Sequence, residues 1–181
     1  MSTPIPTADD DGAAAPQTSL GPFSSAGATP TPWEETEWAL RRIQKFQLCT
    51  VRRDGRPHVT PLLATWAFGA MWFTTGPDEQ KARNLATNPR CALTSGTDTL
   101  TGTDYVIEGT ASLVTDEAAR EAAATAFEQA YGWHLTREDG TWYGLGDAVR
   151  TGTVQLYRVR PDRGFAFAIG SEPSQTRYRW R

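Results

Sequence analysis

Apolar and polar residues alternate along much of the chain after residue 45, a period of two that is typical of β-strands with one buried face. Two such runs, 46–53 and 56–67, flank Asp54-Gly55, a dipeptide that favours the tight turn of a hairpin. Further runs follow at 71–75, 91–95, 103–114, 153–160 and 165–169. Six or seven short strands with few helices predict a mainly β fold with flanking helices, built as a small antiparallel barrel.

Helical signals are confined to three segments. Thr31-Pro32-Trp33-Glu34 fits a capping box with proline in the first turn, and it predicts a helix that runs to about residue 45. Gly76-Pro77-Asp78 opens a second helix that ends before Asn88-Pro89. An alanine-rich third helix is expected over 116–131, and a loop over 132–150.

Residues 1–32 differ in composition from the rest of the chain. They contain six of the twelve prolines, with Ala, Thr, Ser and Gly between them, and few side chains that could build a core. This composition predicts a disordered Pro/Ala/Thr-rich tail. Residues 33–181 are then long enough to form one domain with a single core.

Charge and cysteine content narrow the function classes. Lys and Arg number 18 against 21 Asp and Glu, and three of the acids lie in the tail, so residues 33–181 are neutral. A neutral domain has little electrostatic attraction for nucleic acid or an anionic membrane. Two cysteines 42 residues apart and two histidines argue against a disulfide scaffold and a metal centre. With no long apolar run and no signal peptide pattern, we expect a cytoplasmic protein without nucleic-acid or membrane partners.

The segment 73–77 leads from a predicted strand into the helix that carries Lys81 and Asn84. A helix N-terminus offers unpaired N–H groups and partial positive charge, and nearby hydroxyls and a lysine suit the same task, so a phosphate site is one interpretation. The alternative is an ordinary strand-to-helix turn with a solvated lysine. Asp78 and Glu79 favour the helix start but repel a polyanion.

Other candidates are weaker. His58 in a strand and His134 in a loop are each more typical of a structural or solvent-facing histidine than of a ligand. The chain contains no G-x-S-x-G, P-loop or G-x-G-x-x-G motif, which argues against hydrolase and dinucleotide-fold interpretations. The terminal run 177–181 alternates Arg with Tyr and Trp, which predicts docking onto the body or onto a partner chain; nucleic-acid contact is disfavoured because the domain is neutral.

The runs CTVRRDGRPHVTPLLATW, AMWFTTGPDEQKARNLATNPRCALTS and VIEGTASLV together resemble the pyridoxamine 5'-phosphate oxidase-like, flavin-binding split-barrel family. The likeness covers about 46–114, and 150–180 more loosely. It implies a homodimer of split β-barrels with two flavin-type cofactors, each in a cleft between the subunits.

The resemblance also implies the positions of the site residues. Thr74, Thr75 and Lys81 would hold the cofactor phosphate, Asn84 would brace this region, and the ring would rest against the backbone of 61–66. The full set of implied cofactor-binding residues is His58, Thr60, Pro61, Leu62, Leu63, Ala64, Trp66, Thr74, Thr75, Gly76, Gln80, Lys81 and Asn84, with Gln175, Thr176 and Arg177 from the second subunit.

The chain departs from the vitamin B6 oxidases themselves. Their R-x-V-L-L-K motif is replaced by HVTPLLATW, and their R-L-x-P motif is absent, so pyridoxine 5'-phosphate is not the expected substrate. We expect an FMN-dependent oxidoreductase acting on an unknown small molecule, with no catalytic residue assigned.

Three alternatives stay open. One is a coenzyme F-420-dependent oxidoreductase, although the long anionic tail of that coenzyme needs a basic groove, for which Arg83 and Arg90 are the candidates. The others are a non-catalytic flavin-binding or storage protein, and a haem-handling protein with His58 or His134 as axial ligand.

Overall fold

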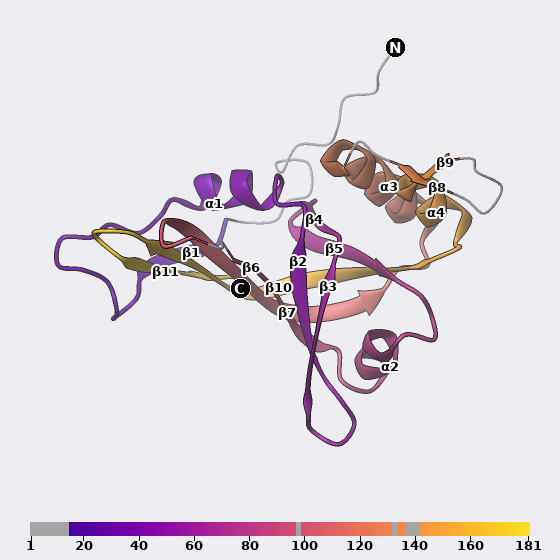
Figure 1. The fold of residues 1–181 in the computed structure, drawn as a ribbon, viewed down its shortest axis with the longest axis horizontal. Helices are drawn as coiled ribbons and strands as arrows, with labels where there is room; N and C mark the ends of the chain where they lie inside the picture. Colours follow the sequence, from indigo (N-terminus) through magenta and orange to yellow (C-terminus); the bar gives the residue numbers. More distant parts are fainter. Residues whose placement is uncertain (1–14, 97–98, 132–133, 137–141) are drawn as a thin grey trace, which may run out of the picture.

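Antiparallel strands make up most of the protein, whose computed structural model describes residues 15–96, 99–131, 134–136 and 142–181 (Figure 1). The described helices are α1 (Trp33–Leu40), α2 (Gln80–Thr87), α3 (Glu117–Tyr131) and α4 (Leu145–Thr151). The described strands are β1 (Gln17–Leu20), β2 (Phe46–Val51), β3 (Pro57–Leu62), β4 (Ala64–Ala67), β5 (Ala70–Thr75), β6 (Arg90–Ser95), β7 (Gly102–Leu113), β8 (His134–Thr136), β9 (Trp142–Gly144), β10 (Gln155–Ile169) and β11 (Ser174–Arg179).

Strand pairing closes the main sheet into a barrel. Neighbouring strands follow the order β1-β11-β10-β7-β6-β2-β3, while β4 pairs with β5 and β5 pairs with β10. Only Leu63 separates β3 from β4, so one bent strand pairs with β2 along its first half and with β5 along its second. Counted that way, six strands form a closed ring, which confirms the predicted mainly β, antiparallel barrel.

Strand β10 connects the barrel to a smaller extension of the sheet. Its first part pairs with β5, and its last part pairs with β11, with a register shift between Pro161 and Arg163. The two strands expected over 153–160 and 165–169 are therefore one strand with a bulge, which bends it away from the barrel axis. Gly109 on the facing strand permits the close approach, because a Cβ there would lie 2.2 Å from the Arg160 carbonyl oxygen.

Strand β1 corrects the prediction for the N-terminal tail. Gln17 through Leu20 pair with β11, the Gly21 N–H donates to the Gln175 carbonyl at 2.6 Å, and the Thr31 N–H donates to the Thr176 hydroxyl at 2.8 Å. Disorder over 1–32 was thus the wrong prediction for 17–31, because an edge strand is held by backbone hydrogen bonds that composition does not reveal. Residues 1–14 lie outside the described part of the chain.

The start of α1 also differs from the prediction. Pro32 occupies the N-cap position without a side-chain hydrogen bond, so the expected capping box is not formed. Trp33 instead anchors the helix on the barrel, with ring centroids 5.2 Å from Trp66, 5.1 Å from Tyr178 and 5.0 Å from Trp180. The aromatic residues of the C-terminal run therefore pack against the barrel: Tyr178 lies in β11, and Trp180 directly follows this strand.

A second apolar cluster lies outside the barrel, where α3 and α4 cover β4 and β5 (Figure 1). Phe127 and Val149 are fully buried there, beside Trp72. Helix α4 lies within the segment expected to be a loop; its C-cap, Gly152, has a φ of 73°, a conformation that suits glycine. Tertiary packing against α3 therefore supports a helix that is too short to be stable alone.

Candidate functional site

The predicted phosphate site lies where β5 ends and α2 begins (Figure 1). Gly76, Pro77 and Asp78 make the turn, and Glu79 is the N-cap residue of α2, without a side-chain capping bond. Gly76 leaves room for the turn to close, because a Cβ on it would lie 3.2 Å from Glu79 Oε1.

The carboxylate of Glu79 sits among hydrogen-bond donors of this turn. The Gly76 N–H donates to Glu79 Oε1 at 2.7 Å, and the Lys81 ammonium donates to Glu79 Oε2. The pKa of Glu79 is lowered below its usual value, first by the hydrogen bond from Lys81, then by the Gly76 N–H, with a smaller effect of the Thr75 hydroxyl. The turn therefore already binds one anionic group, which belongs to the chain itself.

Lys81 is held in an unusual position for a lysine. Its side chain is only 9% exposed, whereas that of its partner Glu79 is 51% exposed. A lysine buried to this extent needs a nearby negative charge, because removing an ammonium from water is costly. The buried cation therefore has as its counter-ion a carboxylate whose side chain is half exposed to solvent.

A chain of hydrogen bonds fixes α2 against the β2–β3 hairpin. Gln80 Nε2 donates to Asn84 Oδ1 at 2.7 Å, and Asn84 Nδ2 donates to Thr50 Oγ1 at 2.9 Å. Thr50 Oγ1 lies 3.4 Å from both His58 Nδ1 and the His58 carbonyl oxygen. Thr50 and Asn84 are buried, so this network holds the first turn of α2 in a defined place relative to His58.

His58 lies close enough to the lysine for its charge to matter. Partial burial lowers the pKa of His58 below 6.5, and the positive charges of Arg52 and Lys81 lower it further. The neutral imidazole is therefore favoured in the unliganded protein. An anion bound beside Lys81 would oppose this effect.

Several predicted residues lie apart from this cluster. Thr74 shares its face of β5 with Trp72, whereas Thr75 shares the other with Phe73, because side chains alternate along a strand. Ala64 and Trp66 are buried; the Ala64 carbonyl accepts the Tyr131 hydroxyl at 2.6 Å, and the Trp66 indole donates to Glu37 at 3.0 Å. Further back along the bent strand, Pro61 is exposed, and Thr60, Leu62 and Leu63 are partly buried.

The three residues expected from a second subunit lie on β11, across the barrel from α2 (Figure 1). Gln175 packs over Gly21, where a Cβ would lie 2.4 Å from its Oε1 atom, and Thr176 is fully buried with its hydroxyl bonded to the Thr31 N–H. Only Arg177 is exposed. The single chain thus brings together the predicted residues Thr75, Gly76, Gln80, Lys81, Asn84 and His58, and leaves these three elsewhere.

Sequence reasoning did not foresee the contacts of two residues of the cluster. Glu79 was expected to favour the helix start and to repel a polyanion; it is the N-cap residue of α2, and its carboxylate accepts from the Gly76 N–H and the Lys81 ammonium. Thr50 joins Asn84 to His58, although it lies 34 residues from Asn84 in the sequence, and no local pattern signals such a contact.

The described residues offer neither a metal site nor a membrane-spanning helix. No group of three or more His, Cys, Asp or Glu residues there could hold a metal ion. Among the described helices, none is both long and apolar enough to cross a membrane. The side chain of His134 lies outside the described residues, so its predicted role as a haem ligand is without a structural test.

Comparison with known proteins identifies the fold. The model of the pyridoxamine 5'-phosphate oxidase family matches residues 33–166. A conserved hypothetical protein from Mycobacterium tuberculosis is similar with a TM-score of 0.62 and 20% identity, over 81% of this chain and 90% of that one. The haem storage protein of Vibrio cholerae gives 0.58 and 19%, over 77% and 96%. An F-420 reductase gives 0.52 and 25%, over 71% and 94%. No relative was found among curated protein sequences.

Proposed function

Because the chain belongs to the pyridoxamine 5'-phosphate oxidase family, we propose that it is an oxidoreductase that binds the phosphate of FMN at the turn between β5 and α2. The observation that carries this proposal is the Glu79 carboxylate, which accepts hydrogen bonds from the Gly76 N–H and the Lys81 ammonium. A carboxylate on a backbone N–H and a buried lysine is a stand-in for a phosphate, which prefers the same donors.

The donors fit a phosphate with little rearrangement. Lys81 stays in place because the network through Asn84 and Thr50 holds its helix against β2. Glu79 only has to rotate toward solvent, where its side chain is already half exposed. The phosphate would then take over the Gly76 N–H and the ammonium, and the partial positive charge of the α2 N-terminus adds to the attraction.

FMN is favoured over coenzyme F-420 because one of the two candidate basic residues for the coenzyme's tail is already in an ion pair. The extended anionic tail of F-420 needs a groove of free cations, and Arg83 and Arg90 were the candidates. Arg90 is instead paired with Asp162, with Nη1 and Oδ2 2.6 Å apart. Arg83 alone does not make a groove, although the likeness to an F-420 reductase keeps this coenzyme as the second candidate.

In the proposed function, the cofactor supplies hydride or electron transfer, and the chain supplies binding and orientation. Lys81 and Gly76 bind the phosphate, Thr50 and Asn84 fix the helix, and Thr60 through Leu63 form the accessible surface against which a ring can lie. The substrate is a small molecule other than pyridoxine 5'-phosphate, because the R-x-V-L-L-K and R-L-x-P motifs are missing.

We further propose that the protein functions as a homodimer. Register places Pro61 on β3 and Arg177 on β11 at opposite ends of one row across the outer face of the sheet, with Gln47, Thr94, Val106 and Phe165 between them. One chain therefore cannot bring both ends to one ligand, whereas a second copy can. Val59, on the same face as Pro61, is 57% exposed, and a second copy packed on this face would bury its apolar side chain.

Binding of FMN compared with riboflavin tests the phosphate site. The Lys81→Met variant should weaken FMN binding by about 10- to 150-fold, which corresponds to about 1.5–3 kcal/mol for a lost charged hydrogen bond. Riboflavin, which has no phosphate, should bind this variant and the unmodified protein equally. Arg83→Met is the matched control, since Arg83 is an exposed cation of the same helix. Unchanged FMN affinity in the Lys81 variant would place the phosphate elsewhere.

Spectra and kinetics separate the remaining alternatives. Absorption titrations with FMN, F-420 and haemin identify which group binds, and a Soret band abolished by His58→Ala would support the haem interpretation. Stopped-flow reduction of the flavin-loaded protein by NADH or NADPH, followed by a panel of acceptors, distinguishes an oxidoreductase from a storage protein. A bound flavin that is never turned over would contradict the proposed enzyme.

A further inference from the structure

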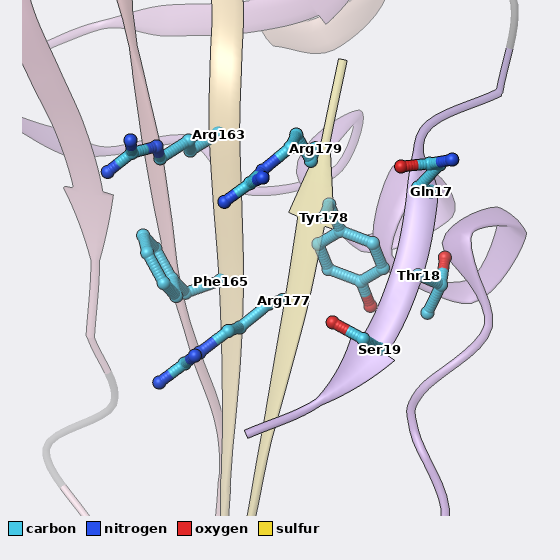
Figure 2. A pocket seen from close by; sticks show the side chains of 8 residues that line it. All are labelled: Gln17, Thr18, Ser19, Arg163, Phe165, Arg177, Tyr178 and Arg179. Atoms are coloured by element: carbon cyan, nitrogen blue, oxygen red, sulfur yellow. The ribbon is translucent and has the colours of Figure 1, made fainter. Parts of the chain in front are cut away.

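Two cavities of similar size lie on different parts of the molecule. The arginine pocket, of about 800 Å³, is formed by β10, β11 and β1, and its lining includes Arg163, Phe165, Arg177 and Arg179. Figure 2 shows the three arginine side chains reaching to one side of β10 and β11. Because Phe165 and Arg177 belong to the row that a second copy would cover, this pocket is part of the interface already proposed.

The second cavity, of about 860 Å³, lies between the end of α1, strand β4 and helix α3, and no residue of that row lines it. Sites for small molecules typically have volumes of roughly 300–1,000 Å³. Strand β4 begins directly after Leu63, so the cavity starts where the backbone proposed to carry the cofactor ring ends. A molecule held in this cavity would therefore lie beside the ring.

Helix α3 gives the cavity a flat apolar wall. Four of its alanines recur at every fourth position, which places them on one face of the helix, and all four line the cavity: Ala118, Ala122, Ala126 and Ala130. Alanine projects only a methyl group, so this wall leaves room for a wide ligand. The Tyr131 hydroxyl donates to the Ala64 carbonyl at 2.6 Å, which fixes the end of α3 on β4 and keeps the cavity in shape.

Phe68 adds an aromatic ring to the lining at a cost to its own backbone. It is the first residue of the two-residue turn between β4 and β5, and its φ of 51° is positive, as is the φ of 65° at Gly69. Such turns favour Asn, Asp or Gly, because a bulky side chain is strained at positive φ. The ring packs edge-on against Trp72, with centroids 6.3 Å apart. A phenylalanine at this position is explained by the apolar surface that it gives the cavity.

One exposed cation of the lining has no acidic partner. Arg42 makes no ion pair within the described residues; its guanidinium lies 3.9 Å from the centroid of the Trp38 ring and donates to the Trp38 carbonyl at 3.3 Å. These contacts orient the guanidinium without neutralising it. Arg41 and Glu121, the other charged residues of the lining, each form an ion pair with a residue outside it. The cavity therefore has one positive charge that is not balanced.

We propose that this cavity takes the substrate of the oxidoreductase, and that the substrate is a flat, largely apolar ring compound with one carboxylate. The alanine wall and Phe68 accommodate the ring system, whose removal from water favours binding. The Arg42 guanidinium binds the carboxylate through paired N–H donors. This inference rests on the proposed function, because the substrate must lie beside a flavin ring carried by the strand that ends at Leu63.

Isothermal titration of the full chain with 2-naphthoate tests the charge of the ligand. Naphthalene-2-carboxamide is its uncharged counterpart, and it should bind about tenfold or more weakly, the difference that corresponds to one charged hydrogen bond. Arg42→Gln should lower the affinity for naphthoate to that for the amide. Lys45→Gln is the matched control, an exposed cation just beyond α1 that does not line the cavity, and it should bind both compounds normally.

Two further variants test the shape of the cavity. Ala122→Leu fills the space beside α3 and should weaken both compounds by about tenfold or more, whereas Ala122→Ser keeps the space and should bind them normally. Leucine is as acceptable as alanine in a helix, so the filled variant should fold, which its melting temperature checks. Phe68→Asn suits the positive φ of the turn and should also weaken both compounds.

Titrations with and without FMN separate this inference from the proposed function. Naphthoate should bind in both cases and should shift the absorption spectrum of bound FMN, because the two rings would lie side by side. If FMN affinity does not depend on Lys81 but naphthoate still binds through Arg42, the proposed phosphate site fails and the cavity stands. The cavity proposal is overturned if naphthoate does not bind, if it binds Arg42→Gln or Ala122→Leu normally, or if saturating FMN excludes it.

Discussion

The turn at Lys81 and the arginine pocket differ in how their positive charges are compensated. At the turn, a single lysine is buried, and the chain supplies its counter-ion through Glu79. In the pocket, three exposed arginines lie together without a carboxylate among the lining residues. An anion bound at the turn, as proposed, would have to displace the Glu79 carboxylate, which would weaken its binding, whereas an anion bound beside the arginines would relieve their repulsion.

The two regions also differ in how they are supported. Buried hydrogen bonds of Asn84 and Thr50 hold the turn, so its geometry is fixed before any ligand binds. The pocket depends on β1, a four-residue strand whose side chains are all exposed and which is joined to β11 by backbone pairing. Removing the Asn84–Thr50 hydrogen bond should therefore affect ligand binding at the turn only, and removing β1 should affect ligand binding at the pocket only.

The largest expected effect is on stability, from removal of β1. Deleting residues 1–24 should lower the free energy of unfolding by about 2–4 kcal/mol, since several backbone hydrogen bonds worth about 1 kcal/mol each are lost. Deleting only 1–14 is the control and should change little. Chemical denaturation measures the stability. FMN and riboflavin should lose affinity equally, because the pocket of the second copy is lost while the phosphate donors at the turn remain. A loss confined to FMN would mean that the two regions are coupled.

The converse change is Thr50→Val, which removes the hydroxyl that accepts from Asn84. A buried amide left without its partner costs about 1–3 kcal/mol of stability. Denaturation should show this loss, FMN binding should weaken, and riboflavin binding should stay normal. Thr50→Ser keeps the hydroxyl and is the matched control. A stable Thr50→Val protein with full FMN affinity would contradict the role given to this network.

Glu79→Gln tests the internal competitor. Glutamine keeps the size of the side chain but loses its charge, so the Lys81 ammonium becomes more available, and FMN should bind about three- to tenfold more tightly. Asp78→Asn, which neutralises the adjacent exposed acid, should have a smaller effect. Fluorescence quenching of FMN measures both. Weaker binding to the glutamine variant would indicate that Glu79 supports the cofactor.

The smallest effect is the titration of His58. Its pKa lies below 6.5 in the folded chain, so the unfolded chain binds more protons between the two values. The stability from neutral His58 is complete above pH 6.5 and is lost as the pH falls toward the folded value. FMN phosphate beside Lys81 should raise the pKa of His58, while riboflavin, which has no phosphate, should not. NMR titration of the imidazole, with His58→Gln for assignment, measures this shift.

Local pattern was sufficient for much of the fold. The Asp54-Gly55 turn joins β2 and β3, and the Gly76-Pro77-Asp78 turn leads into α2, as expected, because both depend on backbone preferences of neighbouring residues. Lys81 and Asn84 lie in this helix, as expected from the same local pattern. These features are decided within a few residues, and a sequence expresses them directly.

Features that join distant segments of the chain could not be predicted from local sequence. Pairing of β1 with β11 depends on an exposed edge created by the rest of the sheet, and α4 depends on the surface offered by α3. The arginine pocket follows from register between Arg163 and Arg179, which the bulge in β10 sets.

The contacts of the polar residues at the turn between β5 and α2 likewise depend on tertiary packing. Local sequence placed a lysine at the start of a helix, whereas Thr50 reached Asn84 only because the barrel closed around them. Burial of Lys81 and the position of the Glu79 carboxylate beside it arise in the folded chain, where desolvation makes a nearby charge necessary. The local sequence was enough to single out the candidate residues. Only the folded barrel decided which residues they contact, because burial and strand register depend on residues far apart in the chain.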